Sequence, residues 1–370
     1  MSNCPRGGST IARGHNHSML IGIHPDRIGQ ESYSDKWSEY LRARNVEVRM
    51  VNLLAPDALE QVRDCDGVMW RWVHTEQFKQ SAQRILYAIE HYLQIPVFPD
   101  TPTAWHYDEK VAQYYLLDAL QAPTPQAWVF WNAEEALHWL ETAPYPLVFK
   151  LSVGAGASNV VKVLQAGQAA GLVQRAFHRG IFPMTMNEYR ESAGFPRSRA
   201  AMLALLRRMK DAMRYILYND YPRLHETWWK PEHGYAYFQE YLPDNAFDTR
   251  VTVIGERAFA FRRFNRPDDF RASGSGLLDY DQQAIDPRCI EIAFAVSRRG
   301  RFQSMAYDFL YRQGEPVICE ISYTFLDRAV YACPGHWDRD MRWVAGQLWP
   351  EEAQVEDFLT TVHANRARRG

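Results

Sequence analysis

Two acidic residues in the last third of the chain are placed to share a metal ion. Asp308 lies in "MAYDFLY" and Glu320 in "PVICEISY", and the "RQGE" between them is typical of a hairpin turn. Asp308 and Glu320 should therefore lie on adjacent strands, with Ser322 on the same face as Glu320. Because two carboxylates repel each other and are costly to bury among apolar residues, a hard cation such as Mg²⁺ is favoured between them. The alternative is a pair of solvent-facing acids on an edge strand.

A cluster of arginines lies upstream of these acids, in "DTRVTVIGERAFAFRRFNRPDDFRASGSG" (248–276). Planar guanidinium groups on strands suit bidentate recognition of phosphate or carboxylate. Strand alternation puts Arg262 and Arg263 on opposite faces, so they cannot both reach one ligand. The alternative is a surface set paired with nearby aspartates. The cluster comprises Arg250, Arg257, Arg262, Arg263, Arg266 and Arg271.

A loop of small residues follows a lysine in "YPLVFKLSVGAGASNVVKV" (145–163). The glycines lead into a second β-rich run and not into a helix, so a hairpin is predicted here and not a dinucleotide or Walker loop. Gly154 and Gly156 lack Cβ atoms, so backbone amides can approach an anion closely, and Lys150 adds a positive charge. On this stretch alone, an ordinary hairpin tip with a solvated lysine is an equally good interpretation.

Taken in chain order, these segments resemble the motifs of ATP-grasp enzymes, in the branch of glutathione synthetase and the ribosomal-protein glutamate ligases. The resemblance covers roughly residues 19–325, interrupted by an insertion at 165–234, and each motif is weak on its own. The motifs are "DEK" before a helix, "PLVFKLSVGAGAS", "FQEYL", "DTRVTVIG", "DFRASGSG" with the arginine before it, and "YDFL…CEIS".

The resemblance implies ATP as cofactor together with Mg²⁺ or Mn²⁺. Residues 239–242 would grip the adenine, and residues 153–158 would form a flap over the phosphates. Nucleotide contacts are implied for Lys110, Lys150, Gly154, Gly156, Ser158, Gln239, Glu240, Tyr241, Leu242, Asp248, Arg250 and Ser273. Catalytic roles are implied for Lys150, Arg263 and Arg271, and metal ligation for Asp308, Glu320 and Ser322.

Two positions depart from the family pattern. The family usually has asparagine two residues after the metal-binding glutamate and again two residues after the second arginine. Here these positions are Ser322 and Ser273, which keep a polar oxygen but lose the amide. Together with the long insertion, these changes indicate a diverged subgroup whose substrates do not follow from the resemblance.

The activity implied by the resemblance is ligation of a carboxylate to an amine (or a thiol) through an acylphosphate. Its partners would be small-molecule or peptide carboxylate and amine substrates. Two alternatives keep the fold: a kinase that phosphorylates a hydroxyl group, or a nucleotide-binding module with weak catalysis.

The elements that must position these residues predict an α/β (α+β) chain. Short apolar runs alternating with helical patterns over 19–100 predict a parallel, Rossmann-like domain without GxGxxG, which would be the pre-ATP-grasp domain. The predicted organisation is a disordered lead (1–18), this domain (19–100), a small ATP-grasp subdomain (101–164), a helical insertion (165–234), a large ATP-grasp subdomain (235–330) and a C-terminal helical segment (331–370). A helix is predicted over 338–364.

The insertion contains an amphipathic helical pattern at 198–218, with an apolar stripe opposite several arginines. A core-facing stripe with a solvated basic face is the favoured interpretation, and a docking surface for an acidic or phosphorylated partner is the alternative. The same helix is one possible surface for a homodimer.

Composition excludes several classes of function. The 370 residues carry a net charge of -2, which argues against a nucleic-acid partner. No apolar run is long enough to span a membrane, and the first residues lack the apolar region of a secretory signal. The five cysteines form no CxxC, which indicates free thiols in the cytoplasm, and Cys319 is interpreted as a buried small hydrophobe.

Overall fold

The computed structural model describes most of the chain. The described residues are 18–26, 32–73, 76–154, 159–181, 183, 223–224, 227–228, 231–266 and 276–369. Several predicted features lie outside them: residues 1–17 of the lead, Gly156, Ser158, Arg271, Ser273 and the helical pattern at 198–218.

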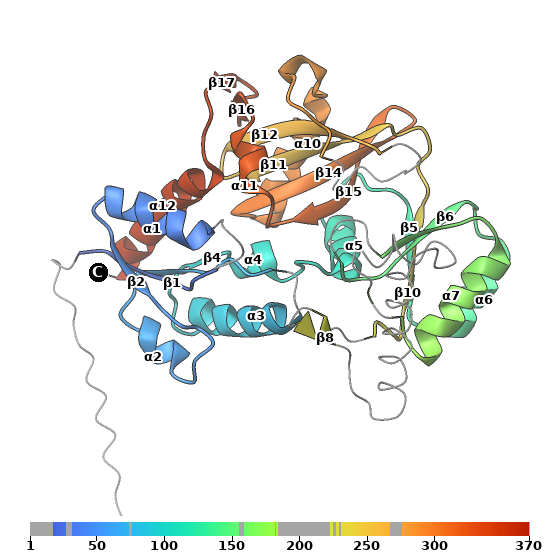
Figure 1. Ribbon diagram of the computed structural model, residues 1–370, viewed down its shortest axis with the longest axis horizontal. Helices are drawn as coiled ribbons and strands as arrows, with labels where there is room; N and C mark the ends of the chain where they lie inside the picture. Colours follow the sequence, from blue (N-terminus) through green and yellow to red (C-terminus); the bar gives the residue numbers. More distant parts are fainter. Residues whose placement is uncertain are drawn as a thin grey trace, which may run out of the picture.

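The N-terminal domain is built on a parallel sheet, as the alternating pattern predicts. Its strand order is β2-β1-β3-β4, and every neighbouring pair is parallel. Helices cover both faces of the sheet (Figure 1), so β1, β3 and β4 are apolar, whereas the edge strand β2 carries Glu47 and Arg49. Its elements are β1 (Leu20–Ile23), α1 (Tyr33–Ala43), β2 (Glu47–Met50), α2 (Ala58–Val62), β3 (Gly67–Met69), α3 (Glu76–His91) and β4 (Val97–Phe98).

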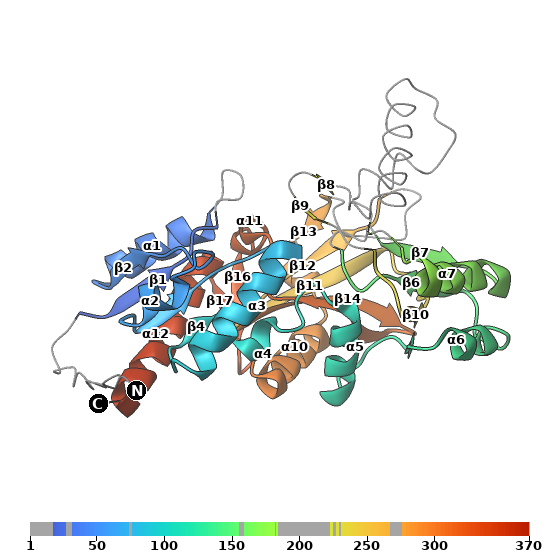
Figure 2. The same cartoon turned by 90° about the horizontal axis from the view of Figure 1, so that it is seen from below.

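A smaller antiparallel sheet follows, in the order β5-β10-β6-β7. Strands β6 and β7 form the predicted hairpin, with Lys150 opposite Val160. Helices α6 and α7 cover one face of this sheet, where Phe149 and Leu172 share a buried core (Figure 2). The elements are α4 (Thr101–Ala104), α5 (Lys110–Ala119), β5 (Ala127–Phe130), α6 (Ala133–Trp139), β6 (Leu147–Lys150), β7 (Val160–Val163), α7 (Ala166–His178) and β10 (Ala236–Glu240).

The predicted helical insertion at 165–234 is only partly helical. Helix α7 begins it, but β8 (Arg223–Leu224) pairs with β9 (Thr227–Trp228) near its end. Threonine and tryptophan fit an extended backbone better than a helix, which accounts for this local difference.

The largest sheet holds the acid and arginine motifs. Its strands run in the order β15-β14-β11-β12-β16-β17, and β13 pairs with β12. Helix α10 packs against it and has no counterpart among the predicted elements, although Asp286 caps its start and Pro287 occupies its first position. The elements are β11 (Phe247–Ile254), β12 (Arg257–Phe264), β13 (Leu278–Asp279), η1 (Gln282–Ala284), α10 (Pro287–Gly300), β14 (Ser304–Arg312), β15 (Glu315–Ser322) and α11 (Asp327–Tyr331).

The helix predicted over 338–364 is wrong in its first part. Strands β16 (Gly335–Asp338) and β17 (Trp343–Ala345) form a hairpin, and α12 (Pro350–Arg369) begins only at a proline, which suits the first turn of a helix. Helix α12 packs beside α1, and Trp37 Nε1 donates to Gln354 Oε1 at 3.0 Å (Figure 1). The C-terminal helix therefore completes the core of the N-terminal domain.

No helix in the described residues is long and apolar enough to cross a membrane.

The close approach of α12 to β3 requires a glycine. A Cβ atom at Gly67 would lie 2.8 Å from Phe358 Cζ and 2.9 Å from Val362 Cγ2. We expect Gly67→Ala to lower the free energy of unfolding by about 1–3 kcal/mol, because overpacking must displace these side chains. Urea-induced unfolding of the purified protein measures this change.

Gly171 is the matched control, because a Cβ atom there meets nothing within 4 Å. Gly171→Ala in α7 should leave stability unchanged or raise it by about 0.5–1 kcal/mol, since alanine restricts the unfolded chain. Equal effects of the two substitutions would show that α12 does not pack tightly on β3.

Candidate functional site

Most of the predicted site residues that the structure describes line a cleft between the smaller antiparallel sheet and the largest sheet. The cleft is open to solvent and spans about 840 Å³ when that open solvent is included. The small sheet contributes one wall and the large sheet the other, and α5 lies at one end. The lining residues that the sequence also singled out are Lys110, Lys150, Gln239, Glu240, Tyr241, Leu242, Asp248, Arg263, Asp308 and Glu320.

Two buried lysines enter the cleft from different elements. Lys110 is the first residue of α5, and Lys150 is the last residue of β6. Lys110 Nζ lies 2.7 Å from the carbonyl oxygen of Gly154 and 3.4 Å from Glu320 Oε1. Lys150 Nζ lies 3.7 Å from Cys319 Sγ. Both cations thus reach from the small-sheet side toward the acids of the large sheet.

The base of the predicted flap is tied to the start of α5. Gly154 has φ 114°, a left-handed conformation that favours glycine, and its amide donates to Asp108 Oδ1 at 3.0 Å. The Lys110 amide donates to the Ser152 carbonyl at 2.8 Å. Because Lys110 Nζ also contacts the Gly154 carbonyl, the position of this lysine depends on the conformation at the flap base.

The segment predicted to grip adenine runs along one edge of the cleft. Gln239 and Glu240 end β10, and Tyr241 and Leu242 follow directly. Lys162 Nζ lies 3.6 Å from the centroid of the Tyr241 ring, so the β7 side of the hairpin supports this segment through a cation–π contact. The wall here combines an aromatic ring with aliphatic side chains, an environment that suits a planar base.

An ion-pair network crosses the opposite wall. Arg263 Nε and Nη2 each lie 2.6 Å from the Asp248 carboxylate, and Nη2 lies 2.7 Å from Asp308 Oδ2. Arg250 binds the two oxygens of Asp308 at 2.7 and 2.8 Å. These contacts connect three neighbouring strands, because Asp248 pairs in register with Arg263, and Arg250 with Asp308.

The network separates the acid strengths of its two carboxyl groups. Burial favours the neutral acid at Asp308, but Arg250 and Arg263 outweigh burial and hold its pKa below the usual value. Burial and the neighbouring Asp308 carboxylate raise the pKa of Asp248. Asp308 is therefore the member that keeps its negative charge most firmly.

The metal ligation expected of Asp308 and Glu320 stays a prediction, and in the structure both side chains have cationic partners from the protein itself. Asp308 and Glu320 do lie in register on β14 and β15, but two arginines neutralise Asp308, and Lys110 lies near Glu320. The described residues contain no cluster of three or more histidine, cysteine or acidic side chains that could hold a metal.

Two residues with predicted ligand roles have other contacts. Ser322 Oγ donates to the Thr324 carbonyl at 2.7 Å, and Ser322 is absent from the described cleft lining. Arg250 also lies outside that lining and binds Asp308 instead of facing the open space.

The interpretation of Cys319 as a buried small hydrophobe is wrong, because Cys319 lines the cleft and is only partly buried. Strict alternation along β15 would place Cys319 and Glu320 on opposite faces. The register of β14 with β15 shifts between Asp308 and Phe309, so Cys319 is the extra residue of a β-bulge. No signal in the sequence marks the bulge. Asn245, Leu310 and Pro125 also line the cleft and were not predicted.

Arg262 faces away from the network, as strand alternation predicts. It pairs with Asp279, and its guanidinium carbon lies 5.0 Å from the centroid of the Phe247 ring and 5.4 Å from that of Phe264. The neighbouring arginines of β12 thus have different environments: Arg263 is 7% exposed, and Arg262 is 22% exposed.

Comparison with known proteins identifies the fold. The sequence matches no protein-family model and no curated protein. The structure is similar to D-alanine–D-alanine ligase from Bacillus anthracis at 12% identity, covering 95% of this chain and 100% of that chain, with a TM-score of 0.53. It is also similar to the ATP-grasp ligase PsnB complexed with minimal precursor, at 13% identity, 94% and 100% coverage and a TM-score of 0.51. A RimK domain ATP-grasp protein from Sphaerobacter thermophilus matches at 14% identity, 92% and 99% coverage and a TM-score of 0.50.

These similarities define an α/β protein with the ATP-grasp fold, the fold expected from the sequence motifs. At these identities they establish the fold alone. The roles of individual residues depend on the geometry of the cleft.

Removing Arg263 should destabilise the protein strongly. Arg263→Met would leave Asp248 without its bidentate partner inside the protein, so we expect a loss of about 3–5 kcal/mol in unfolding free energy. Arg262→Met on the same strand should cost no more than about 1 kcal/mol, because its ion pair is partly exposed. Chemical denaturation of both variants would contradict the network if their losses were equal.

Proposed function

We propose that this protein is an ATP- and Mg²⁺-dependent ligase that joins a carboxylate to an amine through an acylphosphate. The observation that carries the proposal is the cleft between two antiparallel sheets, with lysines entering from one side and carboxylates on adjacent strands on the other. Such an arrangement suits a triphosphate, whose charge needs both direct cations and a carboxylate-bound metal.

The chain's own residues would position and neutralise the reacting groups. Lys110, Lys150 and Arg263 would bind phosphate oxygens and offset the charge that develops on the transferred phosphoryl group. Residues 239–242 would hold the base. The flap base at Gly154 would carry the loop that keeps water from the acylphosphate.

The donor set fits Mg²⁺, which commonly uses one or two carboxylates together with phosphate oxygens and water. Asp308 and Glu320 would hold it, and Ser322 would contribute at most a hydroxyl that already donates to Thr324. When bound, Mg²⁺ would neutralise phosphate charge. Because Asp308 is engaged by two arginines, ligand binding would require at least one of these contacts to loosen.

The similar structures support ligation over phosphorylation of a hydroxyl group, since D-alanine–D-alanine ligase and PsnB are both named as ligases. PsnB was solved with a minimal precursor, and peptides are among the substrates that the sequence motifs imply, so a peptide is the first class of substrate to test.

The direct test measures ADP formation with Mg²⁺, ATP and a panel of carboxylates and amines that includes acidic peptides. We expect ADP release to require both a carboxylate and an amine, with a mass increase corresponding to an amide. ADP accompanied by a phosphorylated alcohol would contradict ligation and favour a kinase. ATP binding without turnover across the panel would favour a binding module.

Substitutions on β15 test the roles of its acids. Glu320→Ala should lower kcat/KM by about 10²–10³, because the Mg²⁺ that would neutralise the triphosphate would lose a carboxylate ligand in the cleft. Glu315→Ala on the same strand is the control and should keep the wild-type rate, since Glu315 is 73% exposed and pairs at the surface with Arg288. A wild-type rate for Glu320→Ala at saturating ATP would refute the metal assignment.

Lys150→Ala tests the opposite wall. The buried ammonium lies beside the acid-bearing strand and would stabilise the transferring phosphoryl group, so we expect a loss of about 10²–10³ in kcat. Steady-state kinetics, with circular dichroism as the check on folding, measures this loss. An unchanged kcat would mean that Lys150 does not contact the phosphates.

A further inference from the structure

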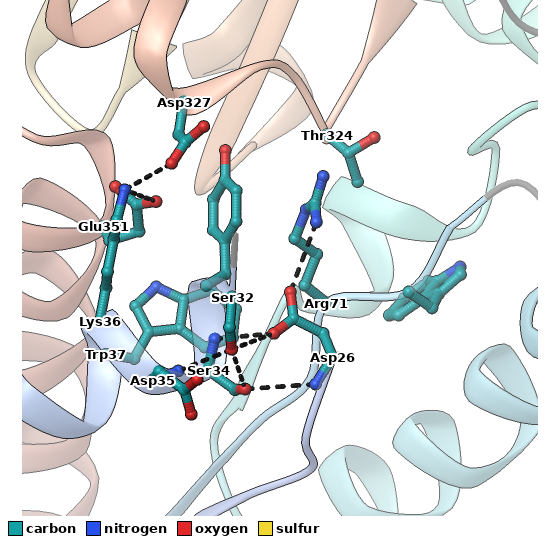
Figure 3. A network of polar contacts seen from close by, with 12 residues as sticks. Asp26, Ser32, Ser34, Asp35, Lys36, Trp37, Arg71, Thr324, Asp327 and Glu351 are labelled. Atoms are coloured by element: carbon teal, nitrogen blue, oxygen red, sulfur yellow. Dashed lines mark hydrogen bonds and ion pairs between the residues drawn. The ribbon is translucent and has the colours of Figure 1, made fainter. Parts of the chain in front are cut away.

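A second polar site lies at the edge of the N-terminal parallel sheet, next to the segment that follows β15. Strands β1 and β3 end at Ile23 and Met69, and Asp26 and Arg71 come shortly after them. The carboxyl ends of parallel strands are where open α/β sheets bind ligands. Figure 3 shows the Arg71 guanidinium extending from Asp26 toward the segment that carries Thr324.

Asp26 holds one side of this guanidinium. Its carboxylate is fully buried and accepts from the Ser34 amide at 2.9 Å and from Ser32 Oγ at 3.1 Å. Arg71 Nη1 reaches it only at 3.4 Å. The guanidinium carbon of Arg71 lies 4.2 Å from the centroid of the Tyr33 ring, so the planar group is stacked as well as tethered.

Arg71 has donor capacity that the described contacts do not use. A guanidinium carries five N–H donors, but the described residues give Arg71 one long hydrogen bond, and its buried Nε has no partner. Arg263, by contrast, uses its N–H donors in short contacts with two carboxylates. An unsatisfied buried donor is costly, so a purely structural role does not account for Arg71.

The position of Arg71 is fixed relative to the candidate ligase site. The Trp72 amide donates to Tyr323 Oη at 3.0 Å, and Tyr323 Oη donates to the Trp72 carbonyl at 2.8 Å. Tyr33 Oη donates to the Phe325 carbonyl at 2.9 Å. Trp72, which follows Arg71, and Tyr33, whose ring stacks on the Arg71 guanidinium, are therefore both hydrogen-bonded to residues 323–325. This segment directly follows Glu320 and Ser322.

We propose that Arg71 binds an oxyanion of the substrate, a carboxylate or a phosphate, through a bidentate contact on the side away from Asp26. This inference rests on the proposed ligase function, because it places the substrate between the N-terminal domain and the end of β15 that carries Glu320 and Ser322. Arg71 then selects substrates that carry an anionic group in addition to the group that reacts, and it acts as a specificity residue.

Titration calorimetry with defined probes tests this site. Glutarate and N-acetylglutamate represent carboxylates, and glycerol 3-phosphate represents phosphates. We expect wild-type protein to bind one of these classes and Arg71→Met to weaken that binding by about 10- to 100-fold, the effect of losing a charge-assisted pair. Arg71→Lys should weaken it as well, because lysine keeps the charge but loses the planar fork.

Arg49→Met is the matched control, since Arg49 is an exposed arginine on β2 of the same domain and pairs with Asp64. It should bind the probes as wild-type does. Absence of binding to wild-type protein, or equal binding by wild-type and Arg71→Lys, would overturn the proposal. Thermal unfolding checks each variant, and Arg71→Lys carries the test if Arg71→Met does not fold.

A parallel titration with Mg²⁺ and ATP separates this inference from the proposed function. Arg71 is absent from the cleft lining, so Arg71→Lys should keep the wild-type affinity for ATP. Probe binding that depends on Arg71 in a protein without ATP affinity would refute the ligase and leave the oxyanion site standing. ATP affinity together with probe binding that does not depend on Arg71 would refute the oxyanion site and leave the proposed ligase function standing.

Discussion

Neutralisation of buried charge on the large sheet is the constraint on which the site depends. Asp248 and Asp308 are too buried to stand alone, and Arg263 lies between them with short contacts to both. The antiparallel register sets Asp248 beside Arg263 and Arg250 beside Asp308, so the pairing of the backbones also pairs the charges. A shift of one residue between these strands would leave several charges unpaired, which makes the register and the electrostatics of this wall inseparable.

The wall that carries Lys110 and Lys150 has fewer internal ion pairs among the described residues. Lys110 and Lys150 come from a helix start and a strand end, and among the described residues each reaches across the cleft to one side chain of the large sheet. Lys110 also contacts the Gly154 carbonyl at the flap base, so a change in the conformation of the flap would change the position of Lys110 Nζ in the cleft. A wall with few internal pairs keeps its charges available to a ligand, whereas the large sheet brings charges that are already balanced.

The N-terminal domain joins this arrangement through aromatic and backbone contacts. Helix α12 crosses back from the end of the chain and closes the core over β1 and β3. Tyr323 then links the loop after β3 to the end of β15 through two hydrogen bonds with Trp72. This connection ties the segment of Arg71 to the end of β15, although 251 positions along the chain separate Trp72 from Tyr323.

The sequence by itself determined the local structure and the order of the motifs. β-Rich runs joined by short turns predicted the β6–β7 hairpin and the adjacent strands of Asp308 and Glu320. Strand alternation predicted the opposite faces of Arg262 and Arg263, because side-chain direction along a strand follows from the backbone alone. Only the tertiary structure decided which distant parts of the chain meet. It pairs Arg263 with two carboxylates, places Cys319 in the cleft through a bulge, and packs α12 against α1. These depend on register and on contacts between distant segments, and periodicity within one segment carries no information about either.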